Sequence, residues 1–423
     1  MEITLPRGTK DYGPEEKILL DSIISKIKRI FELYGYSPLD TPILERYEVL
    51  SAKYAGGSEI LKETFRLKDQ GNRELGLRYD LTVPLARFIA MNPMTKMPFK
   101  RYQIGEVFRD GPIKPGRTRQ FMQCDADTVG AKSIYSDAEC IKIALDVFRA
   151  LKLDVRIEVG SRVLLDSILE KLDVQLDKRL ETILILDKLR KIGPENVEKE
   201  LLELGLSKDL IKNLMVLVSM KGSDEEKLRR LSSFDGASGI KELLQVINNK
   251  SVVFNPSLSR GLGYYTGPIF EVFLKDDELA GSIAAGGRYD SMIGNFVNNK
   301  QDYPAVGVSF GMESIMLAMQ KKVPLKKCNT SVYVIPINTV VKCIRIADEF
   351  RKNDINADLD MNNKGISKNL DYADKLGIPY ALIVGSDELQ KKKLKLKDMQ
   401  TGKERMLDIK TIIKILSDYS KKN

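Results

Sequence analysis

Residues 105–121 read GEVFRDGPIKPGRTRQF, which is the end of one expected strand, a loop rich in Gly and Pro, and the start of a second strand. The flanking segments 100–109 and 120–130 have the composition of strands, so this part of the chain predicts a hairpin. Two more strand-like segments lie far away, at 268–274 and 305–311. Together they predict an antiparallel sheet that is assembled from distant parts of the chain.

Helical patterns surround these strands. Residues 15–34 repeat apolar positions at helical spacing, which predicts an amphipathic helix. Residues 163–250 predict an inserted helical subdomain, although ordinary helices of the same core would produce the same pattern. The expected domains are residues 1–162 and 251–325 for the two parts of a core, 163–250 for the insertion, and 329–423 for a separate domain.

The last part of the chain alternates strands and helices, which is typical of a small α/β domain with a largely parallel sheet. Within it, residues 391–397 read KKKLKLK and are expected at a sheet edge. That edge would either contact phosphate groups or be a solvated strand whose lysines prevent pairing with other chains.

The composition limits the class of protein. The 423 residues carry a formal charge of +9, which suits a polyanionic partner, although a well-solvated, lysine-rich surface would give the same excess. No apolar run approaches the roughly 20 residues that span a bilayer, and the N-terminus lacks signal-peptide features. We therefore expect a cytoplasmic protein without membrane contact.

The composition also limits the chemistry. Four widely spaced cysteines predict reduced thiols rather than disulfides or a thiolate metal site. The chain has no histidine, so imidazole is excluded as a base, nucleophile or metal ligand. Its chemistry must rely on carboxylates, Arg, Lys, Tyr, backbone dipoles and bound metal ions.

Two segments place polar side chains on one face of an expected strand. In RQFMQCDAD, residues 119–127, the alternation puts Phe121, Gln123, Asp125 and Asp127 on one face. A buried amide and two buried carboxylates need partners, so this face is expected to bind a ligand unless the strand faces solvent. In LRYDLTVP, residues 77–84, the same alternation groups Asp80 with Thr82, a suitable seat for an ammonium group.

Basic and glycine-rich segments complete the candidate site. Arg109, Arg117 and Arg119 flank the hairpin loop, where they could grip a triphosphate and a nucleic-acid end or form an exposed basic hairpin. In residues 305–311, small residues alternate with bulky ones, which lets a flat ligand or a second backbone approach. SRGLGYYTGPIFEVF, residues 259–273, places Arg260 before two tyrosines, and AAGGRYD, residues 284–290, supplies two glycines with Arg288 and Tyr289.

Taken together, these segments resemble class II aminoacyl-tRNA synthetases and, among them, the histidyl-tRNA synthetase family. FRDGPIKPGRTRQF is similar to the second motif that defines the class, and RGLGYYTG and AAGGRYD are similar to the two histidine-specific signatures. The resemblance implies an α+β catalytic domain built on an antiparallel sheet, with a helical insertion and a C-terminal α/β anticodon-binding domain. It also implies a homodimer.

The resemblance implies that the chain activates histidine with ATP and transfers it to tRNA(His), with Mg²⁺ carried by ATP and no metal held by the protein. The implied catalytic residues are Arg109 and Arg260. The implied histidine-binding residues are Asp80, Thr82, Arg109, Gln123, Asp127, Arg260, Tyr264, Tyr265 and Tyr289. The implied ATP-binding residues are Arg109, Asp110, Arg117, Arg119, Phe121 and Glu313.

The sequence departs from the family pattern at three positions. Ser314 follows Glu313 where the family places an Arg on the adenine ring, so weak ATP binding is expected. Gly111 and Gly263 each stand where a carboxylate is usual, and Asp110 is expected to substitute for the first. These departures leave an alternative open: a histidine-binding regulatory subunit of ATP phosphoribosyltransferase that charges no tRNA.

Overall fold

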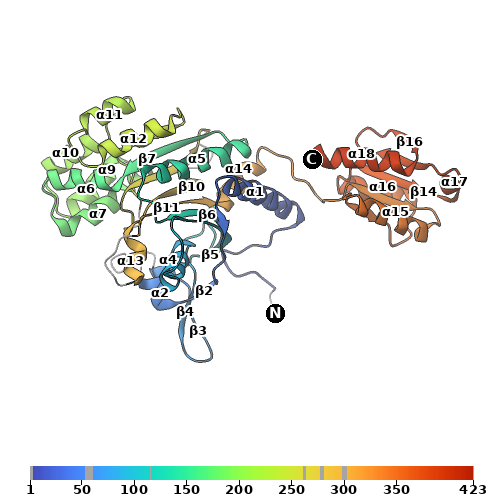
Figure 1. Cartoon of the computed structure of the whole chain (residues 1–423), viewed down its shortest axis with the longest axis horizontal. Coiled ribbons are helices and arrows are strands. Elements are labelled where there is room, and N and C mark those ends of the chain that lie inside the picture. Colours follow the sequence, from blue (N-terminus) through green and yellow to red (C-terminus); the bar gives the residue numbers. More distant parts are fainter. Residues whose placement is uncertain are drawn as a thin grey trace. The chain divides into compact units, whose positions relative to one another are not determined.

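The computed structural model describes residues 3–52, 61–114, 116–260, 263–276, 281–297 and 303–422. By their internal contacts the residues divide into two compact units, residues 1–10 with 22–322 and residues 11–21 with 323–423. The larger unit is built on an eight-stranded sheet and the smaller on a five-stranded sheet, and Figure 1 labels their elements.

The sheet of the larger unit confirms the predicted strands. It runs in the order β1 (Ser37–Pro38), β5 (Phe99–Phe108), β6 (Gln120–Val129), β11 (Ala305–Gly311), β10 (Ala284–Arg288), β9 (Pro268–Leu274), β7 (Val155–Ser161) and β8 (Val252–Phe254). Neighbouring strands from β5 to β7 are antiparallel. The two edge strands β1 and β8 pair in parallel, so the sheet is mixed at its margins.

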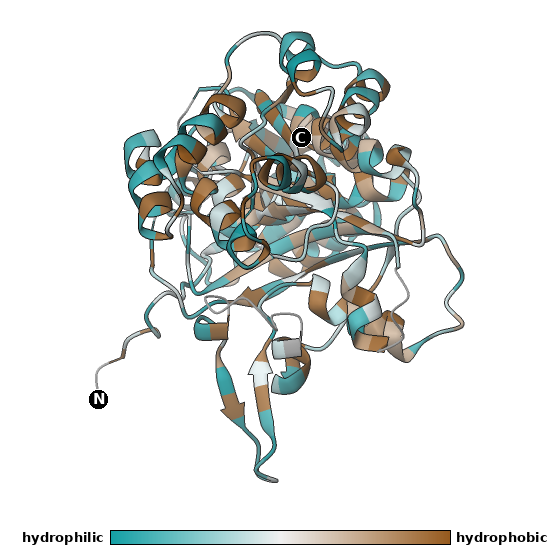
Figure 2. Ribbon diagram, turned by 90° about the vertical axis from the view of Figure 1, so that its left-hand side faces the viewer, coloured by the Kyte–Doolittle hydropathy of each residue, from teal (hydrophilic) through white to brown (hydrophobic). Residues whose placement is uncertain are grey.

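One face of this sheet forms the core. Cys124 and Ala126 of β6 are fully buried on it, and helix α5 (Ile134–Ala150) packs across β10 and β11. Phe310 of β11 lies with its ring centroid 5.9 Å from Phe31 of α1 (Pro14–Leu33) and 5.7 Å from Phe148 of α5. Figure 2 shows helices of this unit with hydrophobic residues on one side and hydrophilic residues on the other. A cavity lies over the opposite face of β6.

Between β7 and β8 the chain forms helices and no strand over residues 162–247, all of which the structure describes. The helices are α6 (Arg162–Lys171), α7 (Leu176–Leu186), α8 (Leu189–Ile192), α9 (Pro194–Glu203), α10 (Lys208–Val218), α11 (Asp224–Arg230) and α12 (Ala237–Ile247). Helices α6, α10 and α11 each begin after a serine whose side chain accepts a backbone N–H group, and at α11 Ser223 and Glu226 form a capping box. In Figure 1 these helices gather at one end of the unit.

The described part of the larger unit contains further helices and a small second sheet. They are the helices α2 (Tyr47–Ala52), α4 (Thr82–Met91), α13 (Ser291–Val297) and α14 (Met312–Gln320) and a three-stranded sheet in the order β2 (Leu44–Arg46), β4 (Glu74–Leu77) and β3 (Arg66–Lys68). Helix α4 packs against α13, and α14 packs against β6.

The strand expected over residues 77–84 is wrong. Strand β4 ends at Leu77 and helix α4 begins at Thr82. One oxygen of the Asp80 carboxylate accepts hydrogen bonds from the backbone N–H groups of Thr82 (3.1 Å) and Val83 (2.9 Å). A carboxylate that caps the first turn favours a helix, and this local hydrogen bonding outweighs the period-two alternation of the sequence.

The smaller unit has the predicted α/β pattern. Its sheet runs β13 (Ala357–Leu359), β12 (Val332–Pro336), β14 (Tyr380–Val384), β15 (Leu394–Asp398) and β16 (Glu404–Leu407), with parallel pairing only among the first three strands. Its helices are α15 (Val340–Lys352), α16 (Ile366–Lys375), α17 (Ser386–Gln390) and α18 (Ile409–Lys422). The expected edge position of residues 391–397 is wrong, because β15 lies between β14 and β16.

Among the described residues of both units, no helix has the length and apolar character that a membrane crossing requires.

The contact between β10 and β11 gives a test of the fold. A Cβ built on Gly286 would lie 2.1 Å from the backbone oxygen of Gly307, so we expect Gly286→Ala to lower the free energy of unfolding by about 3 kcal/mol or more. Gly239 in α12 has no atom within 4 Å of such a Cβ, so Gly239→Ala should be neutral or stabilising by up to about 1 kcal/mol. Urea unfolding of both variants measures the difference, and equal midpoints would contradict it.

Candidate active site

A cavity of about 250 Å³ lies over the polar face of β6. Ten of the residues that the sequence suggested line it, namely Asp80, Thr82, Arg109, Phe121, Gln123, Asp127, Arg260, Tyr264, Tyr265 and Tyr289. They come from the start of α4 and the segment before it, the β5–β6 hairpin, the segment that leads into β9, and the residue that follows β10. The structure therefore gathers segments that are up to about 200 residues apart in the sequence into one site.

A buried ion pair forms one wall of the cavity. Arg101 is fully buried on β5 directly opposite Asp127, and its Nη2 lies 2.8 Å from Asp127 Oδ2. The hydroxyl of Tyr289 donates to Asp127 Oδ1 at 2.6 Å. Burial and the neighbouring charge of Asp127 raise the pKa of the Tyr289 hydroxyl well above its ordinary value, so Tyr289 stays protonated. Sequence reasoning missed Arg101, although an arginine inside a buried strand was a signal.

A second polar pair lies beside this ion pair. The side-chain amide of Gln123 donates to the hydroxyl of Ser309 at 2.7 Å, and Ser309 is the register partner of Asp125. Asp125 is 3% exposed. Burial and the charge of Asp127 raise the pKa of the Asp125 carboxyl to about 7. The alternation of the strand grouped Asp125 with the site, but it was not among the candidate ligands.

The two candidate catalytic arginines are held by aromatic rings. The guanidinium of Arg109 lies 4.2 Å from the ring centre of Tyr79 and 4.8 Å from that of Phe121. Arg260 Nη1 donates to the Tyr265 hydroxyl at 3.2 Å, and Arg260 Nε lies 3.7 Å from a carboxylate oxygen of Glu271. Both arginines line the cavity, so two cations meet the carboxylates of β6 there.

Four expected ATP ligands do not line the cavity. Arg117 contacts Glu63 at 3.1 Å and Arg119 contacts Asp110 at 3.0 Å, so these charges are engaged within or beside the hairpin. Glu313 accepts a hydrogen bond from the backbone N–H of Met122 at 3.1 Å. These positions lie around the cavity rather than on its lining.

The structure clarifies the Gly111 departure. A Cβ on Gly111 would lie 2.6 Å from Glu63 Oε1, so the Glu63 carboxylate occupies the space beside this glycine. The same carboxylate accepts a hydrogen bond from the Tyr79 hydroxyl at 3.3 Å. Glu63 thus connects the hairpin loop to the ring that supports Arg109, and no local sequence signal pointed to it.

The other two departures lie at contacts between elements. Ser314 Oγ is 3.2 Å from the place that a Cβ on Gly116 would take, so helix α14 approaches the hairpin loop closely there. A Cβ on Gly263 would lie 3.5 Å from Leu180 of α7. A side chain larger than serine at 314 would therefore have to share space with the loop.

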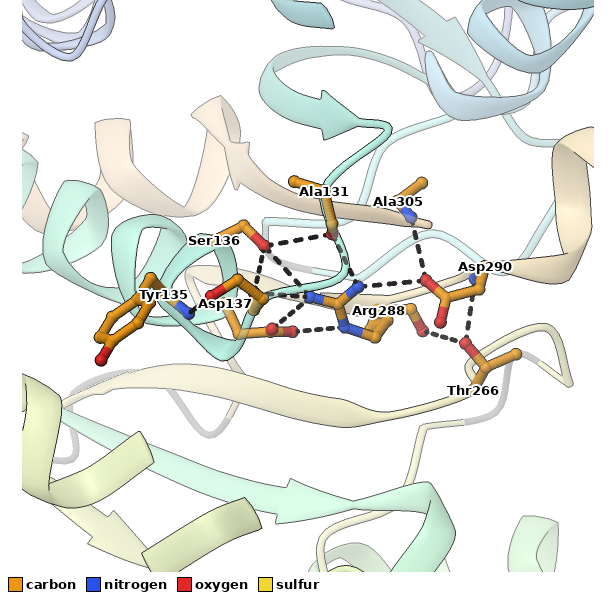
Figure 3. Close-up of polar contacts among 9 residues, drawn as sticks. Ala131, Tyr135, Ser136, Asp137, Thr266, Arg288, Asp290 and Ala305 are labelled. Atoms are coloured by element: carbon orange, nitrogen blue, oxygen red, sulfur yellow. Dashed lines mark hydrogen bonds and ion pairs between the residues drawn. The ribbon is translucent and has the colours of Figure 1, made fainter. Parts of the chain in front are cut away.

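Arg288 fixes the end of β10 beside the cavity. Figure 3 shows its guanidinium among acceptors from α5 and from the segments around it. It donates to both carboxylate oxygens of Asp137, to Asp290 Oδ1 at 3.2 Å and to Ser136 Oγ at 3.1 Å. Asp290 in turn accepts from the backbone N–H of Ala305 at 2.9 Å. Because Tyr289 lies between two anchored residues, its ring is held in the cavity wall.

This network gives a stability test. In Arg288→Met the buried Asp137 carboxylate loses its cation, so we expect a loss of roughly 3–5 kcal/mol in unfolding free energy. Arg149→Met is the matched control, because Arg149 is 79% exposed in its pair with Asp146 and such pairs contribute about 0–1 kcal/mol. Chemical denaturation of the two variants compares them. Similar losses in the two variants would show that the Arg288 network contributes no more to the unfolding free energy than an exposed ion pair does.

The raised pKa of Asp125 gives a pH test. The folded chain keeps a proton on Asp125 up to about pH 7, whereas an unfolded chain loses it near pH 3.8, the ordinary pKa of an aspartate side chain. This group therefore makes the folded state progressively less stable as the pH rises through that window. Asp125→Asn should remove this part of the pH dependence. Thermal unfolding midpoints at several pH values from 4 to 8 would measure it, and parallel profiles for the two proteins would refute it.

Comparison with known proteins agrees with this site. A family model described as histidyl-tRNA synthetase matches residues 8–315, and a model described as an anticodon binding domain matches residues 331–419. A relative from Bacillus cereus named "Histidine--tRNA ligase 1" is 42% identical over 429 residues, covering 99% of this chain and 100% of the relative.

Solved structures give the same result for the fold. Histidyl-tRNA synthetase from a Nostoc species matches with a TM-score of 0.87 and 28% identity, covering 99% of this chain and 100% of the other. An ATP phosphoribosyltransferase regulatory subunit/histidyl-tRNA synthetase from Bacillus halodurans matches with a TM-score of 0.77 at 19% identity, over 91% of this chain and 99% of the other, and this likeness concerns the fold alone. The full-length identity, the family model and the gathered signature residues confirm the resemblance seen in the sequence: the chain belongs to the histidyl-tRNA synthetase family.

Proposed function

We propose that this chain activates histidine with ATP to form histidyl-adenylate and then transfers the histidyl group to tRNA(His). The observation that carries the proposal is the cavity over β6, where a buried carboxylate and tyrosines lie in one space with Arg109 and Arg260. The carboxylate and the tyrosine hydroxyls suit the polar ring of an amino acid. The two arginines suit the negative charge of a phosphate group. The full-length match to histidine–tRNA ligases supports the same reaction.

In the proposed first step, the histidine carboxylate attacks the α-phosphorus of ATP and pyrophosphate leaves. The nucleophile is already ionised, so no protein base is required, and the absence of histidine side chains is no obstacle. Arg109 and Arg260 would bind the α-phosphate and stabilise the charge that develops on it. Stacking of Arg109 on Tyr79 and Phe121 fixes its guanidinium beforehand, which is the condition for electrostatic catalysis.

In the proposed second step, the terminal ribose hydroxyl of the tRNA attacks the carbonyl carbon of the adenylate and a phosphate oxygen accepts the hydroxyl proton. The bond between the carbonyl carbon and the phosphate oxygen breaks, and AMP leaves. Asp127, Tyr265 and Tyr289 would contact the imidazole ring. The ring carries one donor and one acceptor, and a site that pairs both rejects amino acids lacking them by roughly 10⁴-fold. Asp80, Thr82 and Gln123 would contact the amino group, with Tyr264 packed behind Tyr265 at a ring distance of 4.6 Å.

The remaining roles belong to the same proposal. Asp110, Arg117, Arg119, Phe121 and Glu313 would form the ATP site and the contact to the acceptor end of the tRNA, with Mg²⁺ arriving on ATP. We further propose a cytoplasmic homodimer with a catalytic core in residues 1–162 and 251–325, a helical insertion at 163–250 and an anticodon-binding domain at 329–423. The anticodon-domain match over residues 331–419 supports the last of these limits.

The test is histidine-dependent exchange of pyrophosphate into ATP, followed by aminoacylation of tRNA(His). We expect both activities, and we expect Arg260→Met to lower kcat of exchange by about 10²- to 10³-fold because a charge that stabilises the transition state is removed. Arg156→Met is the control, since Arg156 is 44% exposed in its pair with Glu158 and does not line the cavity.

Other outcomes would point elsewhere. Histidine binding without exchange would favour the regulatory subunit of ATP phosphoribosyltransferase, and exchange without aminoacylation would indicate an enzyme that has lost its second step. Equal activity of the Arg260 and Arg156 variants would remove Arg260 from the catalytic role.

A further inference from the structure

We propose that Glu63 is a positioning residue for ATP: its carboxylate holds Arg109 and Arg117 in place and replaces the carboxylate that position 111 lacks. The inference rests on the proposed function, because it takes the β5–β6 hairpin as the part of the site that binds the triphosphate. Glu63 lies before β3, outside the hairpin, so a separate segment of the chain sets the geometry of the two arginines.

The first observation is that Glu63 makes three separate polar contacts around the hairpin. Its two carboxylate oxygens lie 3.1 and 3.3 Å from Nη2 of Arg117. The same carboxylate accepts a hydrogen bond from the Tyr79 hydroxyl at 3.3 Å. The backbone oxygen of Glu63 accepts the backbone N–H of Asp110, the residue after Arg109, at 2.7 Å. One residue therefore contacts both sides of the hairpin loop and the ring beside it.

The second observation is that Tyr79 connects Glu63 to Arg109. Tyr79 is 8% exposed, and burial raises the pKa of its hydroxyl, so the hydroxyl stays protonated and donates to Glu63. The guanidinium of Arg109 lies 4.2 Å from the centre of the Tyr79 ring, and Arg109 Nε donates to the Tyr79 backbone oxygen at 3.3 Å. A ring that is fixed at its hydroxyl end also fixes the cation that stacks on its face.

Arg117 can keep its contact with Glu63 while it binds a phosphate group. Both contacts use Nη2, and a guanidinium carries five N–H donors. The side chain of Arg117 is 50% exposed and that of Glu63 is 21% exposed, so the carboxylate is the more enclosed partner. Glu63 therefore orients Arg117 before ATP arrives instead of competing with the triphosphate for it.

The third observation concerns the space beside Gly111. A Cβ at this position would lie 2.6 Å from Glu63 Oε1, 2.8 Å from Cδ and 3.0 Å from Oε2, so a side chain at 111 would start where the Glu63 carboxylate now lies. The backbone of Gly111 does not have a positive φ, so other residues fit its conformation. The carboxylate of Asp110 pairs with Arg119 at 3.0 Å and thus serves a different arginine. The position of the carboxylate, rather than the segment that carries it, is what the site requires.

The test moves the carboxylate from one position to the other. Glu63→Ala should lower kcat/KM for ATP in pyrophosphate exchange by about 10- to 100-fold, the range expected for a lost charged hydrogen bond. Adding Gly111→Glu to this variant returns a carboxylate to the same space, so the double variant should recover at least about 5-fold. Adding Gly111→Gln fills the space without the charge and should recover about 2-fold or less.

Two ligands separate a displaced hairpin from a damaged cavity. Isothermal titration calorimetry measures the binding of ATP and the binding of histidine separately. Glu63→Ala should weaken ATP binding by about 10-fold or more and histidine binding by less than about 3-fold. The reason is that the imidazole ring is proposed to contact Asp127, Tyr265 and Tyr289 rather than the hairpin loop.

Glu74→Ala is the matched control, because Glu74 lies on β4 of the small sheet that follows Glu63 and pairs there with Lys68 at 3.0 Å. Its side chain is 54% exposed, and such pairs contribute little. The control should change kcat/KM for ATP by less than about 2-fold.

Unchanged ATP kinetics in Glu63→Ala, or a Gly111→Glu double variant no more active than Glu63→Ala, would overturn the proposal. If these variants do not fold, Glu63→Gln provides the second measurement, since the amide keeps the shape and loses the charge. It should raise the KM for ATP by about 3- to 10-fold, and an unchanged KM would overturn the proposal as well. ATP binding by the unaltered chain without histidine-dependent exchange would instead refute the proposed function, and loss of that ATP binding in Glu63→Ala would still support the role of Glu63.

Discussion

The buried guanidinium of Arg101 is the interaction on which the site depends. Its contact with Asp127 joins β5 to the side-chain face of β6, and its hydrogen bond to the backbone oxygen of Leu81 at 2.9 Å joins both strands to the segment before α4. Asp127 then accepts from Tyr289, which brings in the end of β10. Removing one partner of a buried ion pair is strongly destabilising, so Arg101 links the positions of these three segments to one another.

This arrangement explains how a chain without histidine can carry out acyl activation. The substrate brings its own ionised nucleophile, and the protein supplies fixed charges instead of a proton acceptor. The arginines of the site remain charged at every physiological pH. The carboxyl of Asp125 differs, because burial and the charge of Asp127 raise its pKa to about 7. The proposed reaction therefore does not require the fold to position a side chain that accepts or donates a proton.

The parts of the fold that follow a regular period were predictable. The strands at 268–274 and 305–311 match β9 and β11, because their alternation agrees with burial on one face. The prediction of a strand at residues 77–84 was wrong because the Asp80 carboxylate accepts backbone N–H groups at the start of a helix. This local interaction competes with the alternating pattern of the sequence. The prediction that residues 391–397 form a sheet edge was wrong. The lysines suggested an edge strand, but β15 is an interior strand because β16 pairs with it and forms the edge. Arg101 and Glu63 were missed since their partners are distant in sequence. Arg117 pairs with Glu63, Arg119 with Asp110, and Glu313 with the backbone N–H of Met122.

The glycines of β10 and β11 have a consequence for how this cavity can change over evolutionary time. Gly286, Gly287, Gly307 and Gly311 all line it, and a Cβ on Gly307 would lie 2.0 Å from the Asp127 carboxylate. A floor made of main chain cannot be widened by trimming side chains, because glycine has nothing left to remove. It cannot be narrowed at Gly307 either without displacing the Asp127 carboxylate. A change of the cavity toward larger or smaller ligands would therefore require substitutions in the side walls. The depth of the cavity is set by the backbone of the sheet.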